Sequence, residues 1–89
     1  MAGGTVVAAQ PAQAEGCYIF NATSTGVSQR CTSYQILIFR TKTQCRDSWR
    51  PARLYWAYGP WVASGSTSRA TCSAGDYRTN YDSVEISWR

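Results

Sequence analysis

The run CRDSWRPARLYWAYGPW, from Cys45 to Trp61, gathers the side chains best suited to binding chemistry. It holds three of the four tryptophans together with several arginines and tyrosines. Trp, Tyr and Arg are enriched at binding hot spots, because they bury a large area at a low entropy cost. An arginine stacked on an aromatic ring adds about 0.5–2 kcal/mol when it is desolvated. The run therefore predicts either the core of a small fold or a surface that binds a partner.

The composition argues against catalysis. The chain has no histidine, so the Ser-His and Cys-His couples are absent. The single lysine, Lys42, is expected in a polar turn, where nothing favours its reactive neutral form. A domain this small has little material for the cleft of a glycosidase. We therefore predict a non-enzymatic protein with no catalytic residue, and we interpret four carboxylates as surface charges: Asp47, Asp76, Asp82 and Glu85.

Metal ions and cofactors are not expected either. No two cysteines have the short spacing of a zinc knuckle, and histidine ligands are absent. The segment from Asp76 to Asp82 offers too few oxygen ligands for a calcium loop. The cysteines instead predict two disulfides, because an even count behind an export signal is typical of secreted domains. Three connectivities are possible, and we favour the sequential one, which joins Cys17 to Cys31 and Cys45 to Cys72.

The N-terminal segment indicates export. Met1–Ala14 is small and apolar and ends in Ala-Gln-Ala, an A-x-A cleavage site. We interpret it as the remnant of a signal peptide, with a disordered arm as the alternative, and we expect a secreted, extracellular protein. Residues 15–89 then form a single domain, which is short enough to need covalent help. No segment approaches the roughly 18 apolar residues of a transmembrane span.

Turn-forming residues recur about every 8–12 residues, which is typical of an all-β sandwich or barrel. Strands are expected at residues 17–21, 32–41, 53–58 and 82–88, with a hairpin formed by residues 61–63 and 68–72. We predict a small antiparallel β-sandwich of five or six strands with two disulfides. Alternation in the second segment places Ile36, Ile38 and Arg40 on one face and Leu37 and Phe39 on the other.

Alternation also divides the aromatic run. Residues 15–89 hold only nine large aliphatic side chains, so several aromatic rings are expected in the core. Leu54 marks the inner face of its strand, which assigns Trp56 and Tyr58 to the core and turns Arg53 and Tyr55 outward. The candidate partner-binding residues are therefore Trp49, Arg50, Arg53, Tyr55 and Trp61.

The net charge of +4 favours an acidic partner, a polyanion or a cell surface, without selecting among them. A nucleic-acid partner is ranked low, because the charge is modest and a secreted protein rarely meets nucleic acid. We expect a protein partner, either an extracellular enzyme or a subunit of a secreted complex. The alternative is an antimicrobial or toxin-like protein that binds cell-wall glycan or an anionic surface.

The spacing Cys-x13-Cys-x13-Cys-x26-Cys, with strand-like segments between the cysteines, resembles the secreted α-amylase inhibitors of the tendamistat type. The resemblance implies a six-stranded sandwich with two sequential disulfides. That family carries its inhibitory Trp-Arg-Tyr triplet between the first two cysteines, where this chain has YIFNATSTGVSQR. Locally, FRTKTQCRDSWRPARL is similar to small secreted actinobacterial proteins of unknown function, which implies the same compartment. The closing YDSVEISWR resembles the last strand of βγ-crystallin-like killer toxins and antifungal proteins.

Overall fold

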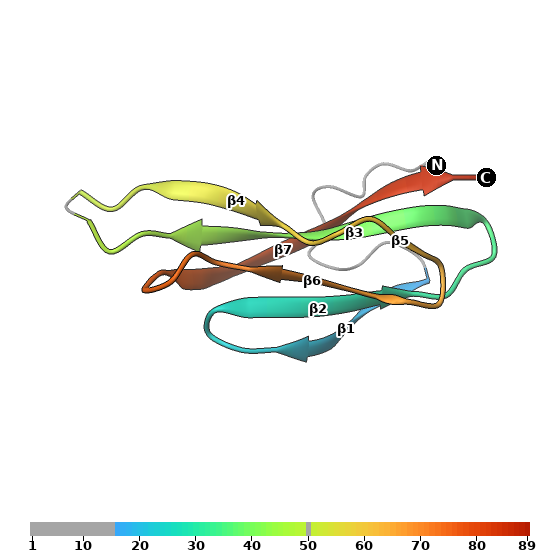
Figure 1. Cartoon of the computed structure of the whole chain (residues 1–89), viewed down its shortest axis with the longest axis horizontal. Coiled ribbons are helices and arrows are strands. Elements are labelled where there is room, and N and C mark those ends of the chain that lie inside the picture. The colour runs from blue at the N-terminus through green and yellow to red at the C-terminus, as the bar shows by residue number, and fades with distance from the viewer. Residues whose placement is uncertain (1–15, 50) are drawn as a thin grey trace.

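The computed structural model describes residues 16–49 and 51–89, and they form two antiparallel sheets that pack face to face (Figure 1). The three-stranded sheet has the order β1-β2-β6 and consists of β1 (Cys17–Ala22), β2 (Gly26–Cys31) and β6 (Thr67–Thr71). The four-stranded sheet is built around β3 (Ile36–Arg46) and also contains β4 (Leu54–Tyr58), β5 (Val62–Ala63) and β7 (Tyr77–Trp88). The predicted leader, Met1–Ala14, lies outside the described residues.

The two antiparallel sheets confirm the predicted all-β sandwich, with seven strands in the described part of the chain in place of the five or six expected. The two disulfides confirm the predicted sequential pairing. Cys17 and Cys31 lie directly opposite each other on β1 and β2, so their bridge joins neighbouring strands of one sheet. Cys45 lies on β3 and Cys72 follows β6, so the second bridge joins the two sheets. The second disulfide is therefore the covalent link across the sandwich.

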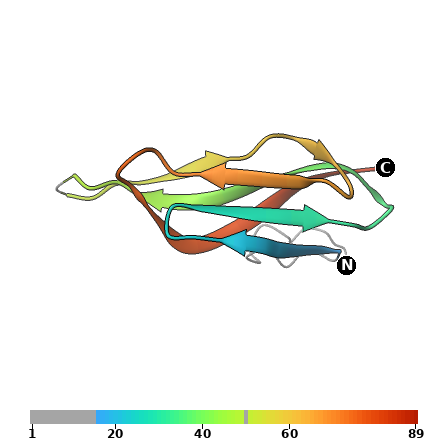
Figure 2. The same ribbon diagram turned by 60° about the horizontal axis from the view of Figure 1, so that its bottom comes forward.

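The central strand β3 uses both of its edges. β7 pairs with β3 from Ile36 to Arg46, so β4 and β5 must share the opposite edge, where they pair with residues 42–46 and 38–39. The four-stranded sheet is thus three strands wide, with a break between β4 and β5. Figure 2 shows that the hairpin formed by β3 and β4 extends beyond the three-stranded sheet at one end of the molecule.

A β-bulge near the start of β3 reverses the alternation expected from the sequence. Ile36 lies opposite Trp88 and Ile38 lies opposite Ser87, so β3 carries one extra residue at this point. Ile36 and Phe39 are both buried as a result, whereas the sequence analysis placed them on opposite faces. The turn predicted around Lys42 is also wrong, because residues 41–43 lie in the middle of β3.

The hairpin predicted across residues 64–66 is wrong as well. β5 pairs with β3 and β6 pairs with β2, so this turn carries the chain from one sheet to the other. The hydroxyl of Ser64 donates hydrogen bonds to the carbonyl oxygens of Cys31 and Ser33 at 3.2 and 2.9 Å, which ties the turn to the end of β2. Gly65 follows with a φ of 95°, a conformation that glycine adopts without strain.

The apolar core is small. Cys31, Ile36, Phe39 and Val84 are buried together, and Cys17, Val62 and Ile86 pack against them. Further along the sandwich the buried side chains are largely polar, and the Thr41 hydroxyl donates to the carbonyl of Ser68 at 2.9 Å. Of all twelve aromatic residues only Phe39 is fully buried, so the prediction that several rings fill the core is wrong.

Candidate functional site

The outer face of the four-stranded sheet is set by the residues of β3 that the core does not use. Thr41, Thr43 and Cys45 are buried on the inner face, so the alternating residues Arg40 and Lys42 point outward. The pairing of β4 with β3 is regular and puts Trp56 and Tyr58 on this same face, because each lies directly opposite an outward residue of β3. The expectation from alternation that both rings lie in the core is therefore wrong.

Cations and aromatic rings alternate across this face. The guanidinium of Arg40 lies 4.1 Å from the centroid of the Tyr58 ring and 4.9 Å from that of Trp61. The ammonium of Lys42 lies 4.6 Å from the ring centroid of Trp56. These distances are within the range of favourable cation–π contact. Each cation therefore stacks on an aromatic ring while its side chain stays partly exposed to solvent.

Glu85 on β7 holds both cations in place. It lies directly opposite Arg40 and accepts its Nε–H at 2.7 Å, and its second carboxylate oxygen is 3.7 Å from the ammonium of Lys42. One carboxylate thus faces two cations, and the group retains a positive charge. We call the residues connected in this way the outer-face cluster: Arg40, Lys42, Trp56, Tyr58, Trp61, Tyr81 and Glu85.

Tyr81 joins the outer-face cluster through an irregular part of β7. Its ring centroid is 5.7 Å from that of Trp56, with the planes tilted by 43°. Here β7 skips register: Thr43 pairs with Asp82 while Cys45 pairs with Arg78, so three residues of β7 lie opposite Gln44. Asn80 adopts a positive φ of 70° within this bulge. The bulge extends the aromatic surface across the sheet.

The structure divides the five predicted partner-binding residues between two places. Trp61 belongs to the outer-face cluster and is 45% exposed. Trp49, Arg53 and Tyr55 line a shallow hollow at the end of the β3–β4 hairpin, beside the loop that joins β6 to β7. Trp49 is the most exposed tryptophan, at 70%. Arg50 lies outside the described residues.

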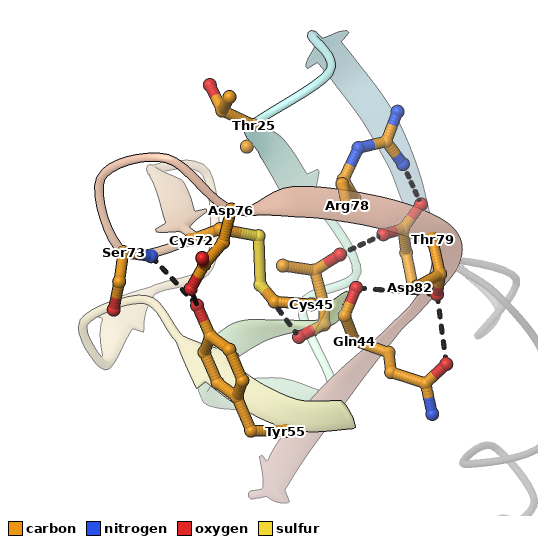
Figure 3. The surroundings of a disulfide bond; sticks show 12 residues. Thr25, Gln44, Cys45, Tyr55, Cys72, Ser73, Asp76, Arg78, Thr79 and Asp82 are labelled. Atoms are coloured by element: carbon orange, nitrogen blue, oxygen red, sulfur yellow. Dashed lines mark hydrogen bonds and ion pairs between the residues drawn. A yellow bond between two sulfur atoms is a disulfide. The ribbon is translucent and has the colours of Figure 1, made fainter. Parts of the chain in front are cut away.

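Tyr55 points inward, contrary to the expectation from alternation, because it lies opposite the buried Cys45. Its hydroxyl donates to a carboxylate oxygen of Asp76 at 2.5 Å and accepts the backbone N–H of Ser73 at 3.0 Å (Figure 3). The ring thereby attaches β4 to the loop that follows Cys72. Asp76 is therefore not an isolated surface charge, as predicted from the sequence, because it accepts a hydrogen bond from Tyr55.

Asp47 organises the tip of the β3–β4 hairpin. Its carboxylate accepts the backbone N–H groups of Arg53 and Trp49 at 2.9 and 3.2 Å, and it pairs with Nε of Arg53 at 2.9 Å. The hydrogen bond from the backbone of Arg53 is the main cause of a lowered pKa for Asp47, with the Arg53 side chain and the backbone N–H of Trp49 acting in the same direction.

We predict that Asp47 titrates below its ordinary pKa of 3.8. Because the folded-state pKa is depressed, the contribution of Asp47 to hairpin stability is fully present above pH 3.8 and is lost as the pH falls through the folded value. Carboxyl carbon chemical shifts, followed by NMR through a pH series, measure this midpoint directly. An unfolded peptide spanning the same residues serves as the reference, and a midpoint at or above that of the peptide contradicts the prediction.

Sequence reasoning missed Arg40, Lys42, Trp56, Tyr58 and Glu85 as one group. A usable signal was present in the chain. A disulfide-bonded cysteine is expected to be buried, so Cys45 marks the inner face of its strand, and counting back in twos from it assigns Thr43 and Thr41 to the same face. That parity turns Arg40, Lys42 and Gln44 outward, and with them Tyr58 and Trp56, which lie opposite Lys42 and Gln44 on β4. The bulge in β7 that adds Tyr81 has no comparable signal.

The fold and the site define a class: a small, disulfide-stabilised β-sandwich with an aromatic and cationic sheet face. Comparison of the chain with protein-family models, curated proteins and solved structures gives no match. The resemblances drawn from the sequence therefore stay predictions. Within the described residues, no helix has the length and hydropathy needed to cross a membrane.

Proposed function

We propose that this protein is a secreted, non-enzymatic binding module that binds another protein, either as an inhibitor of an extracellular enzyme or as a subunit of a secreted complex. The observation that carries the proposal is the placement of the aromatic side chains. Nine of the twelve are at least 44% exposed, while buried positions are filled by residues such as Thr41, Thr43 and Ser68. A chain with few aliphatic residues gains stability by burying aromatic rings, so rings kept outside favour a binding role.

The outer-face cluster supports docking of a protein surface. Most of its members stand on the adjacent strands β3, β4 and β7 of one sheet, and Trp61 lies in the short connection between β4 and β5. The cation–π contacts and Glu85 restrict the rings before any partner arrives. Restriction in the free state lowers the entropy cost of binding. Extracellular localisation, which is also proposed, agrees with two disulfides and no free cysteine among the described residues.

The proposal predicts that Tyr58→Ala combined with Trp61→Ala weakens capture of a partner from culture supernatant by about tenfold or more. Removing both rings eliminates the two cation–π contacts of Arg40 and leaves the residues of the core unchanged. Phe20→Ala is the matched control, because Phe20 is an exposed ring under a cation, 4.1 Å from Arg30, on the opposite sheet. Affinity is measured by surface plasmon resonance once the captured partner has been purified.

Three outcomes separate the alternatives. Loss of binding in the double variant with retention in Phe20→Ala supports the proposal. Equal loss in both variants, or a captured protein that binds the double variant as tightly as the wild type, contradicts it.

A complex with a protein surface is expected to survive moderate salt, because it relies on aromatic burial, whereas adhesion to an anionic surface weakens steeply as salt screens the charges.

The hollow at the hairpin tip favours a second candidate function, binding of cell-wall glycan. It combines the exposed indole of Trp49 with the hydroxyl and carboxylate groups of Ser73 and Asp76, so it offers both a stacking surface and hydrogen-bonding partners. Sedimentation with purified cell walls tests this candidate. Trp49→Ala is expected to abolish sedimentation if the hollow binds glycan and to leave it unchanged otherwise.

A further inference from the structure

The strand β4 has an unpaired edge beside the outer-face cluster. Within the described residues only β3 pairs with β4, so the opposite side of β4 borders no other strand of its sheet (Figure 1). The N–H of Asp47 donates to the carbonyl of Arg53, and the N–H of Gly59 donates to the carbonyl of Thr41. These two bonds identify which residues of β4 are hydrogen-bonded to β3.

Hydrogen-bonded pairs alternate along an antiparallel ladder, so the odd-numbered residues of β4 exchange bonds with β3. The backbone N–H and C=O groups of Leu54, Trp56 and Tyr58 therefore point toward the free edge. The same three residues carry outward side chains, and Leu54 is 59% exposed. The edge thus offers three donors and three acceptors next to an apolar surface.

This edge lacks the usual protection against strand addition. Natural edge strands are guarded by charged residues, internal prolines or bulges. The sequence of β4, LYWAY, has no charge and no proline, and its register with β3 has no irregularity. By contrast, β1 has a bulge between Ile19 and Asn21, and β7 has a bulge opposite Gln44 and several charged residues. Among these three strands β4 is the one left regular, uncharged and open.

We propose that β4 is a docking edge at which an extended acidic segment of the partner adds as a further strand of the four-stranded sheet, an inference that rests on the function proposed above. The added strand would exchange backbone hydrogen bonds with Leu54, Trp56 and Tyr58 and lay alternate side chains beside these residues. Strand addition of this kind takes affinity from the backbone and specificity from alternate side chains.

Charge complementarity selects an acidic occupant. Lys42 and Arg46 lie on β3 directly opposite Tyr58 and Leu54. Glu85 pairs with Arg40 and Lys42, and the three cations together outnumber this one carboxylate. An added strand runs roughly 10 Å from β3, at twice the spacing of adjacent strands. That separation slightly exceeds the Debye length of about 8 Å at physiological salt, and the long side chains of Lys42 and Arg46 bring their charges closer to the added strand than the backbone separation. Acidic residues at alternate positions of the added strand meet this positive field.

The test uses a short synthetic peptide that alternates glutamate with valine, and the same peptide with lysine in place of glutamate. The acidic peptide is expected to bind the wild-type protein and to protect the amide protons of Leu54, Trp56 and Tyr58 from solvent exchange, measured by NMR. The basic peptide is expected not to bind. Failure of the acidic peptide to bind, or binding without protection of these amides, overturns the inference.

Leu54→Pro removes one outward N–H while leaving the ladder with β3 intact, because proline is tolerated where the missing N–H faces away from the sheet. Leu54→Pro is expected to lower the affinity for the acidic peptide by about tenfold or more. Leu54→Thr keeps the N–H and is expected to bind the peptide nearly as well as the wild type does. Exchange protection in the wild type gives an independent readout should Leu54→Pro disturb the hairpin. An acidic peptide that binds Leu54→Pro as tightly as the wild type also overturns strand addition.

The remaining outcomes keep the two proposals distinguishable. A natural partner that is lost with Tyr58→Ala and Trp61→Ala but binds Leu54→Pro normally docks on the face alone, which overturns the edge inference and leaves the proposed function standing. Self-association in sedimentation velocity that Leu54→Pro abolishes identifies a second copy of this chain as the occupant and overturns the acidic-partner inference.

Discussion

Replacing Arg78 with methionine is expected to lower the free energy of unfolding by about 3–5 kcal/mol. Arg78 and Asp82 form an ion pair at 2.6 Å, and their side chains are only 9% and 3% exposed. The second oxygen of Asp82 accepts the hydroxyl of Thr43 at 2.5 Å. Without Arg78 a carboxylate remains buried with no countercharge, and that desolvation cost dominates the effect.

The bulge in β7 makes this ion pair possible. In a regular strand, residues four apart are separated by roughly 13 Å. The three residues of β7 opposite Gln44, with Asn80 at positive φ, shorten that path and let Arg78 reach back to Asp82. Arg78 also donates through Nε to the carbonyl of Thr23 at 2.9 Å, so it connects β7 to the turn between β1 and β2. Its loss is expected to loosen both sheets.

Urea unfolding followed by tryptophan fluorescence measures the change, because the slope reports whether the exposed area stays constant. Arg46→Met is the matched control: Arg46 is exposed on the outer face, and its replacement is expected to cost less than about 0.5 kcal/mol. Adding Asp82→Asn to Arg78→Met removes the orphaned charge and is expected to restore part of the loss. Equal stability of Arg78→Met and Arg46→Met contradicts the assignment.

The sequence predicted the architecture better than the orientation of its strands. Turn punctuation and four cysteines are local signals, and they were enough for an antiparallel sandwich with sequential disulfides. Orientation depends on parity, and the bulge after Ile36 reverses it without any local mark in the sequence. The strand β2 was missed because its inward residues are Val27, Gln29 and Cys31, and the buried Gln29 interrupts the apolar alternation.

The predicted binding residues on β4 differ from the observed ones for a related reason. The alternation pattern predicts that Leu54 marks the inner face of its strand, on the premise that a large aliphatic side chain is buried. At the end of the hairpin the inner face is covered by a polar loop, and a hydroxyl-bearing ring serves there because Tyr55 can bond both Ser73 and Asp76. Leu54 then lies outside with Trp56 and Tyr58. Burial followed the available hydrogen-bond partners rather than hydrophobicity alone.

Removing the disulfide between the sheets, by Cys45→Ala with Cys72→Ala, is expected to cost about 3.6 kcal/mol from the entropy of the unfolded chain, against about 3.0 kcal/mol for Cys17→Ala with Cys31→Ala. The sequence separations are 27 and 14 residues, so loop length alone predicts only this small difference. The locations of the two bridges predict a larger difference between the two losses of stability. The Cys17–Cys31 bridge joins residues that already pair across β1 and β2, whereas the Cys45–Cys72 bridge crosses the sandwich.

The Cys45–Cys72 bridge also fixes the support of β4. Tyr55 bonds the loop that begins directly after Cys72, so the bridge and these hydrogen bonds together hold β4 against that loop (Figure 3). Amide exchange in β4 is therefore expected to accelerate in the Cys45/Cys72 variant and to change little in the Cys17/Cys31 variant. Denaturant unfolding gives the stability difference, and exchange by NMR gives its location. Faster exchange in β4 caused equally by both variants would show that the bridge between the sheets has no special role in positioning the outer-face cluster.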